Sequence, residues 1–224
     1  MIKIGYSHPR KLHEIWTVHD EVKKLVSAAA TTKTIKMGKH MVNLNPSSTS
    51  FIEYLNDNGQ AVLNDILTKT SDILCGKYIR DIETLFPDFV TDKAKVGKRN
   101  QTFSQVRDVA YTIFVTNGYE KLKHKAEFYA ALDVKVCPYC NRCLIEPIDD
   151  GAGKRTVVGE LDHFYCKSKY PYLAVSLYNL VPSCGICNGK SRKGEKDLCG
   201  TMFRNPYLLP DNNGMTFGFK PTGV

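Results

Sequence analysis

The chain has 224 residues and a formal net charge of +8 at pH 7, with 42% hydrophobic and 24% charged residues. This composition is typical of a globular protein, and the length allows one large domain or two small ones. The sequence contains no run of about eighteen apolar residues and no N-terminal signal pattern, so we expect no membrane span and a cytoplasmic location. The positive charge favours a polyanionic partner without establishing one.

Residues 1–133 are predicted to be mostly helical, because apolar residues recur at three- and four-residue spacing. We expect a first helix over residues 12–26 that begins near residue 9, followed by a break at 45–48. Two short helices at 51–55 and 62–66, divided at Asn58-Gly59, come next, and then a longer helix at 71–85. An exposed basic loop at 93–99 precedes two further helices, at 106–114 and 122–132.

The composition changes after Leu132. Cysteine, proline and glycine become frequent, and seven of the eight cysteines lie between Cys137 and Cys199. We therefore divide the chain into a helical region, residues 1–133, whose apolar stripes are expected to form a core or a partner-docking surface, and a second domain, residues 134–224. The fold class expected from this pattern is α+β.

Two Cys-x-x-Cys turns lie in the second domain. Two such turns can supply four thiolates to one tetrahedral Zn²⁺, and a site closed by four thiolates holds structure and leaves no position for a substrate. The predicted ligands of this structural Zn²⁺ are Cys137, Cys140, Cys184 and Cys187. Cys143 creates an overlapping turn and is an alternative to Cys137. The other thiols are expected to pack in the core or lie at the surface: Cys75, Cys166 and Cys199.

The segment Cys137-Pro138-Tyr139-Cys140 is also the active-site tetrapeptide of glutaredoxins. That chemistry requires the motif at the start of a helix, where the helix dipole lowers the pKa of the first thiol. The residues after Cys140 lead instead toward Pro147 and Asp149-Asp150-Gly151, which predicts a hairpin. A thiol oxidoreductase is therefore the least favoured function.

The stretch between the two cysteine turns is predicted to contain two short strands. Residues 157–163 alternate as in a strand, which would place Glu160 and Asp162 on one face and His163 on the other. A polar loop at 165–172 and a second apolar piece at 176–181 follow. After Asn188 the chain is rich in Lys and Arg, and we expect a helix there.

The polar residues of this stretch suit the cleavage of a phosphodiester. His163 can accept a proton from an attacking water near neutral pH. Asp162 and Asn188 can offer oxygen ligands to one divalent cation, Mg²⁺ or Mn²⁺, that acts as a Lewis acid. Asn179 is better suited to bond backbone groups and fix the loop that carries His163. Glu160 is interpreted either as a supporting acid or as a solvated strand residue.

These residues resemble the HNH endonucleases, whose core is a ββα-metal finger. Asp162-His163 matches the first motif, Asn179 the central asparagine, and Asn188 the last position, directly after the second Cys-x-x-Cys. The third residue is Asn, so the set here is His-Asn-Asn. The resemblance implies a zinc-stabilised ββα-metal (HNH) nuclease domain that hydrolyses DNA, with His163, Asn179, Asp162 and Asn188 as catalytic residues.

Basic side chains near the motif are expected to neutralise phosphates of the DNA backbone, which contributes affinity and little sequence information. The predicted DNA-binding residues are Lys167, Lys169, Lys190, Arg192 and Lys193. A zinc-stabilised nucleic-acid-binding module without cleavage activity is the main alternative to a nuclease.

The wider pattern is similar to the HNH nuclease subunits of Septu-type anti-phage systems, also found beside some retrons. The shared pieces are Cys137–Cys140, Asp162–Tyr165, Tyr178–Cys184 and Asn205–Tyr207. Cys166 departs from the family, in which a proline is common at this position. The resemblance implies an ATPase subunit as partner, one that restrains or directs the nuclease.

Overall fold

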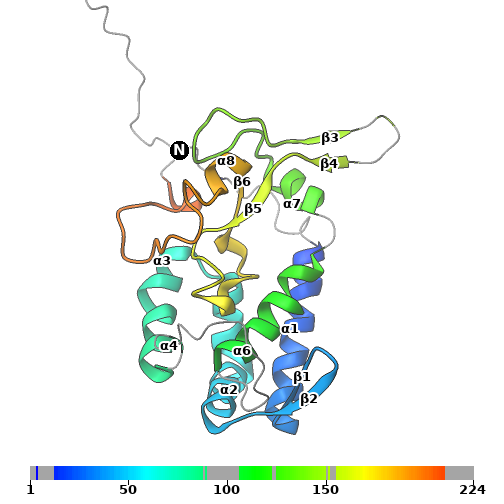
Figure 1. Cartoon of the computed structure of the whole chain (residues 1–224), viewed down its shortest axis with the longest axis vertical. Helices are drawn as coiled ribbons and strands as arrows, with labels where there is room; N and C mark the ends of the chain where they lie inside the picture. The colour runs from blue at the N-terminus through cyan, green and yellow to red at the C-terminus, as the bar shows by residue number, and fades with distance from the viewer. Residues whose placement is uncertain are drawn as a thin grey trace, which may run out of the picture.

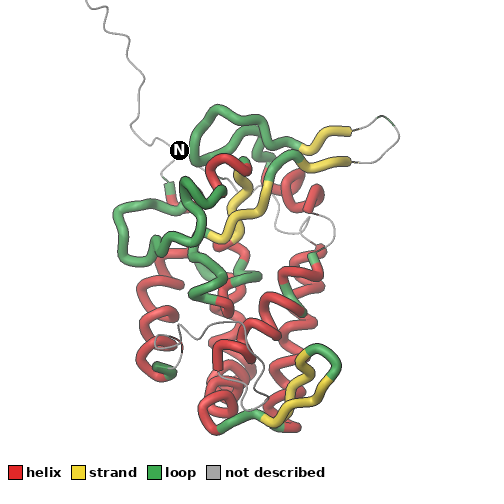
Figure 2. The backbone as a smooth tube through the Cα atoms, viewed as in Figure 1, coloured by secondary structure: helices red, strands yellow, loops and turns green. Residues whose placement is uncertain are grey.

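The computed structural model describes residues 4, 13–87, 89, 106–122, 125–149, 151 and 155–209. Helices fill one half of the protein, and short antiparallel strands and loops fill much of the other, as Figures 1 and 2 show. This mixture confirms the predicted α+β class. The expected start of a helix near residue 9 and the expected loop at 93–99 lie outside the described residues.

The helices follow the apolar periodicity of the sequence closely. Their bounds are α1 His13–Thr32, α2 Pro46–Thr68, a continuous run of α3 Ser71–Ile73, a π-helix Leu74–Ile79 and α4 Arg80–Leu85, then α6 Val106–Ala110 continued by a π-helix Tyr111–Thr116, and α7 Lys125–Leu132. Within the described residues, no helix combines the length and the apolarity that a bilayer span requires.

The start and the interior of α2 show how local residues determine a helix. The Asn45 side chain accepts a hydrogen bond from the backbone N–H of Ser48 at 2.7 Å, and Pro46 occupies the first turn, where no N–H is needed. The helix is interrupted at Asn58 and Gly59, whose φ angles are 47° and 63°. The predicted division at Asn58-Gly59 is therefore confirmed.

A β-hairpin that the sequence analysis missed lies between α1 and α2. Strands β1 (Thr34–Met37) and β2 (His40–Asn43) pair antiparallel, with Met37 opposite His40. Gly38 adopts a φ of 59° in the turn, a conformation that glycine reaches without strain. In the sequence, the two strands correspond to two four-residue runs, one on each side of the turn at Gly38.

The strands of the second half form two separate hairpin-like pairs. Strand β3 (Pro147–Asp149) pairs with β4 (Arg155–Val157), which confirms the hairpin predicted after Cys140. Strand β5 (Glu160–His163) pairs with β6 (Leu180–Ser183), and a 3₁₀ turn, Leu177–Asn179, leads into β6.

The single strand expected over residues 157–163 is wrong, because the chain changes sheet at Val158-Gly159. A Cβ atom on Gly159 would lie 2.7 Å from the Tyr129 hydroxyl and 3.0 Å from the Ile145 Cβ. The backbone therefore passes directly against α7 at this point, and the strand ends where that close approach begins.

The helix expected after Asn188 is also wrong. Helix α8 spans only Gly185–Asn188, and the basic segment that follows forms turns. Gly189 leaves the helix in an extended conformation, and Gly194 has a φ of 51°. These two glycines favour turns over a continued helix, since glycine is the poorest helix former apart from proline.

The helical region and the cysteine-rich region share one apolar core. Hydrogen bonds that cross between them include His19 Nε2 to the Val175 carbonyl at 2.7 Å, Ser176 Oγ to the Ile66 carbonyl at 2.5 Å, and Tyr165 Oη to the Ser71 carbonyl at 2.8 Å. The division into two domains at residues 133 and 134 stays a prediction.

A disulfide joins Cys75 of the helical region to Cys199, with 5.9 Å between the Cα atoms. The expectation that both are unpaired thiols is therefore wrong. The two positions are 124 residues apart, so no local pattern could pair them. The bond also contrasts with the cytoplasmic location expected from the sequence, since the cytosol keeps most thiols reduced.

Alkylation of the denatured, chelator-treated protein without reductant should label six of the eight cysteines, and all eight should react after reduction. Intact-mass spectrometry measures the count. Because the bond closes a loop of 124 residues, its loss should lower the free energy of unfolding by up to about 5 kcal/mol. The variant Cys75→Ser should show seven reactive thiols with or without reductant. Eight labels on the unreduced wild type would contradict the pairing.

His19 makes stability depend on pH. Burial lowers the pKa of its imidazole from 6.5 to about 4, while the hydrogen bond to Val175 opposes the shift. The unfolded chain therefore binds more protons between these pH values, and stability falls as the pH falls. We expect the loss between pH 7 and pH 5 to be about 2 kcal/mol smaller in His19→Gln than in the wild type, as measured by urea unfolding. An equal loss in both proteins would show that the pKa of His19 is not lowered in the folded state.

Candidate functional site

Four cysteine sulfurs from two turns converge. Cys137 and Cys140 flank a turn closed by hydrogen bonds from Asn141 N–H to the Cys137 carbonyl and from Cys137 N–H to the Cys143 carbonyl, each 2.8 Å. Cys184 caps α8, where its sulfur accepts from the N–H of Cys187. The sulfurs of Cys137, Cys140, Cys184 and Cys187 all lie within 4.8 Å of one another.

This sulfur cluster fits a tetrahedral metal ion. A Zn–S distance of about 2.3 Å places the sulfurs of a tetrahedron about 3.8 Å apart, and the sulfurs of Cys140 and Cys184 are 4.0 Å apart. Burial raises the pKa of the Cys140 thiol, but hydrogen bonds from the backbone of Cys143 and Arg142 and from neighbouring cysteine side chains together lower the pKa to about 6. The cluster can therefore hold an ion such as zinc, and it includes Cys137 in preference to Cys143.

One zinc per chain is the expected content of the purified protein, measured by inductively coupled plasma mass spectrometry. Cys140→Ser removes a ligand and should lose the metal and lower the melting temperature, because binding to a preformed cluster stabilises the fold. Cys143→Ser is the matched control, since Cys143 lies in the same turn outside the cluster, and it should keep the metal. Loss of zinc from Cys143→Ser alone would assign the site to the overlapping turn instead.

His163 lies at the end of β5, is buried, and is fixed by the loop before β6. Its Nε2 donates a hydrogen bond to the Ala174 carbonyl at 3.0 Å. A carbonyl accepts only, so the neutral ring carries its proton on Nε2 and its lone pair on Nδ1. The ring also meets Tyr119 edge to face, with 4.4 Å between centroids.

Asp162 is a buried carboxylate with a partner on each oxygen. Its Oδ1 lies 2.9 Å from Lys193 Nζ, and its Oδ2 accepts from the Tyr139 hydroxyl at 2.7 Å. Burial raises the pKa of Asp162, and the Lys193 ammonium opposes that shift. Tyr139 belongs to the first cysteine turn, so it links the sulfur cluster to the carboxylate. Sequence analysis did not find this role for Tyr139.

Asn179 is buried and bonds only backbone groups among the contacts described. Its Oδ1 accepts from the Tyr165 N–H at 2.7 Å, and its Nδ2 donates to the carbonyls of Tyr165 and Leu173 at 3.1 and 2.9 Å. These bonds connect the two ends of the loop that follows His163. The arrangement agrees with the bracing role expected for this amide.

Asn188 lies at the end of α8, and its Nδ2 donates to Glu160 Oε2 at 2.7 Å. That bond orients the amide and leaves Oδ1 as its acceptor atom. Glu160 is exposed at the start of β5. Of the two interpretations of Glu160, the contact with Asn188 favours the supporting acid.

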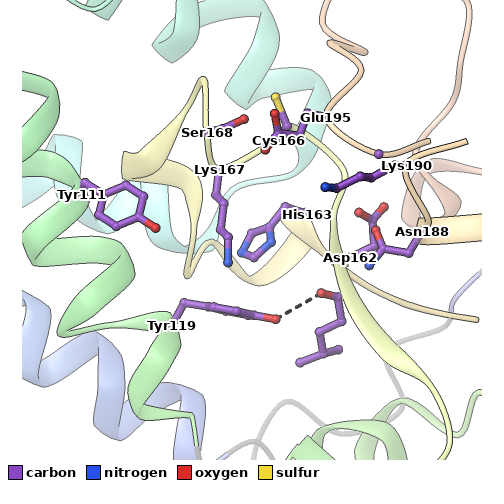
Figure 3. A pocket seen from close by; sticks show the side chains of 12 residues that line it. Tyr111, Tyr119, Asp162, His163, Cys166, Lys167, Ser168, Asn188, Lys190 and Glu195 are labelled. Carbon is purple, nitrogen blue, oxygen red and sulfur yellow. Dashed lines mark hydrogen bonds between the residues drawn. The ribbon is translucent and has the colours of Figure 1, made fainter. Parts of the chain in front are cut away.

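Asp162, His163 and Asn188 line one pocket of about 340 Å³, shown in Figure 3. Its other lining residues are Tyr111, Tyr119, Leu161, Cys166, Lys167, Ser168, Lys190, Gly194 and Glu195. Tyr111 and Tyr119 come from the helical region, in which the sequence analysis found no residue with a chemical role. Hydroxyl, carboxylate, imidazole and ammonium groups therefore meet in one hollow.

The predicted DNA-binding residues do not all lie together. Lys167 and Lys190 line the pocket, with Lys167 Nζ 4.6 Å from the centre of the Tyr119 ring. Lys193 has a side chain only 9% exposed and is paired with Asp162, and it also donates to the His163 carbonyl at 2.6 Å. Lys169 forms ion pairs with Asp197 at 2.5 Å and Glu83 at 3.7 Å. Arg192 is exposed in the turn after α8. DNA contact by these residues stays a prediction.

Comparison with known proteins gives one partial likeness. The chain is 41% identical over 61 residues to the Septu protein PtuB of Bacillus thuringiensis. The match covers 27% of this chain and 23% of that protein, so it spans less than a quarter of the relative. No family model matches the chain, and no solved structure matches it.

Proposed function

We propose that this protein is a metal-dependent HNH-type endonuclease that hydrolyses DNA phosphodiester bonds. The observation that carries the proposal is the meeting of Asp162, His163 and Asn188 in one pocket with Lys167 and Lys190. A cluster of four cysteines lies beside it and is connected to Asp162 through Tyr139. This combination supplies a base, oxygen ligands and positive charge within one hollow.

His163 is arranged to act as the general base. Because Nε2 donates to the Ala174 carbonyl, Nδ1 is the ring atom whose lone pair takes a proton from water. Lys167 and Lys190 provide positive charge in the pocket for the phosphate oxygens of the substrate.

The oxygen donors fit a divalent cation such as Mg²⁺ or Mn²⁺. Asp162 offers a carboxylate and Asn188 an amide oxygen, both hard ligands. Each Asp162 oxygen accepts one partner and keeps a further lone-pair position. When bound, the cation supplies Lewis acidity at the phosphate and stabilises the leaving oxygen.

We further propose that the nuclease acts in anti-phage defence with an ATPase subunit as its partner. The partial likeness to the Septu protein PtuB supports this setting. Because the likeness covers under a quarter of that protein, the proposed ATPase partner rests on the resemblance in the sequence.

A nucleic-acid-binding module without cleavage is the second candidate. The observation that favours it is the ion pair between Lys193 and Asp162, since the ammonium already neutralises the carboxylate that a cation would need.

The geometry of the first cysteine turn argues against the third alternative, a thiol oxidoreductase. The Cys137–Cys140 segment lies in a turn and not at the start of a helix, and burial raises the pKa of the Cys137 thiol.

Supercoiled plasmid should be nicked or linearised by the purified protein with Mg²⁺ or Mn²⁺, and EDTA should prevent it. His163→Ala removes the general base and should lower the cleavage rate about 10²–10⁴-fold, while the protein still folds and keeps the zinc content of the wild type. His40→Ala, which changes an exposed histidine in β2, is the matched control and should cleave normally. Binding of the plasmid without cutting, under every metal tested, would favour the binding module.

A further inference from the structure

We propose that Tyr119, contributed by the helical region, is a positioning residue that holds both His163 and Lys167 in the cleavage pocket. The inference rests on the proposed nuclease function and deepens it. It assigns to the helical region a part in the chemistry beyond partner docking.

Three contacts join Tyr119 to β5 and the loop after it, as Figure 3 shows. Its ring lies 4.4 Å from the His163 ring at an interplanar angle of 64°. The Lys167 ammonium lies 4.6 Å from the centre of the same ring. The phenol donates a hydrogen bond to the Leu161 carbonyl at 3.2 Å. One side chain therefore contacts the backbone beside Asp162, the base and a cation.

The ring contact constrains the imidazole in addition to the hydrogen bond to Ala174. The bond at Nε2 fixes the position of one ring atom. The Tyr119 ring, packed edge to face, restricts the tilt of the imidazole plane and so contributes to the direction of the Nδ1 lone pair.

Lys167 gains a defined position from the same ring. A lysine side chain has four flexible carbons and places its ammonium poorly by itself. The negative face of the Tyr119 ring attracts the ammonium and holds it in the pocket near His163. The Tyr119 ring thereby positions the His163 imidazole and the Lys167 ammonium relative to one another.

Tyr119 is itself held by a rigid turn. It begins a short 3₁₀ helix, Tyr119–Lys121, closed by a bond from Lys121 N–H to the Gly118 carbonyl at 2.9 Å. A Cβ atom on Gly118 would overlap the Phe114 carbonyl and lie 3.1 Å from Val175 Cγ1. The turn is packed tightly against the π-helix before it and against the loop that holds His163.

The test compares Tyr119→Leu, which removes the ring, with Tyr119→Phe, which keeps it. We expect Tyr119→Leu to lower kcat for oligonucleotide cleavage by about 10–100-fold, since small misplacements of reacting groups have effects of this order. KM should also rise, because Lys167 loses its support. Tyr119→Phe should stay within about threefold of the wild type in both constants, given that the ring contacts persist.

Tyr178→Leu is the matched control. Tyr178 is also a half-buried tyrosine with an edge-to-face aromatic contact, to Tyr207, and it does not line the pocket. It should keep the wild-type kcat. If Tyr119→Leu keeps the wild-type kcat, or if Tyr178→Leu loses as much as Tyr119→Leu, the inference is overturned.

A spectroscopic readout separates this inference from the nuclease proposal. The imidazole proton resonances of His163, assigned by their absence in His163→Ala, should move in Tyr119→Leu and not in Tyr119→Phe, because the ring current of Tyr119 is lost only in the former. An inactive wild type would overturn the nuclease proposal. In that case a shifted His163 resonance still supports placement by Tyr119, and an unchanged one overturns it.

Discussion

Four sulfurs from turns 44 residues apart must meet at one point, and the geometry of the pocket depends on this convergence. The first turn carries Tyr139, which bonds Asp162, and the second turn leads directly into Asn188. Because both polar groups are attached to the cluster, an ion held there would set their separation. A structural metal can in this way control a reactive site without touching a substrate.

The loop between β5 and β6 is the second determinant, and it is braced by several bonds in succession. The Asn179 amide bonds the Leu173 carbonyl, His163 bonds the Ala174 carbonyl, His19 bonds the Val175 carbonyl, and the Ser176 hydroxyl bonds the Ile66 carbonyl. Four consecutive residues therefore have a fixed partner. Since two of these partners belong to the helical region, the orientation of the proposed base depends on helices far from it in sequence.

Local patterns predicted what local physics decides, such as the helix periodicity, the break at Asn58-Gly59 and the bracing role of Asn179. The sulfur cluster was also predictable, because Cys-x-x-Cys spacing has a direct geometric meaning. Contacts between distant segments were not. Neither the Cys75–Cys199 bond nor the approach of Tyr119 to His163 leaves a trace in nearby sequence, and the strand break at Gly159 follows from contact with α7. Such contacts can be identified only from the folded structure.

The continuous core also limits how this protein can be divided or recombined. Val175 and Leu173, in the braced loop, are fully buried in that core. Cutting the chain before the cysteine turns would uncover these side chains and leave the Val175 carbonyl without its donor, His19 of α1, at a cost in solubility. The cysteine-rich part is therefore not an interchangeable module, and a hybrid protein that borrows it would have to borrow the helices as well.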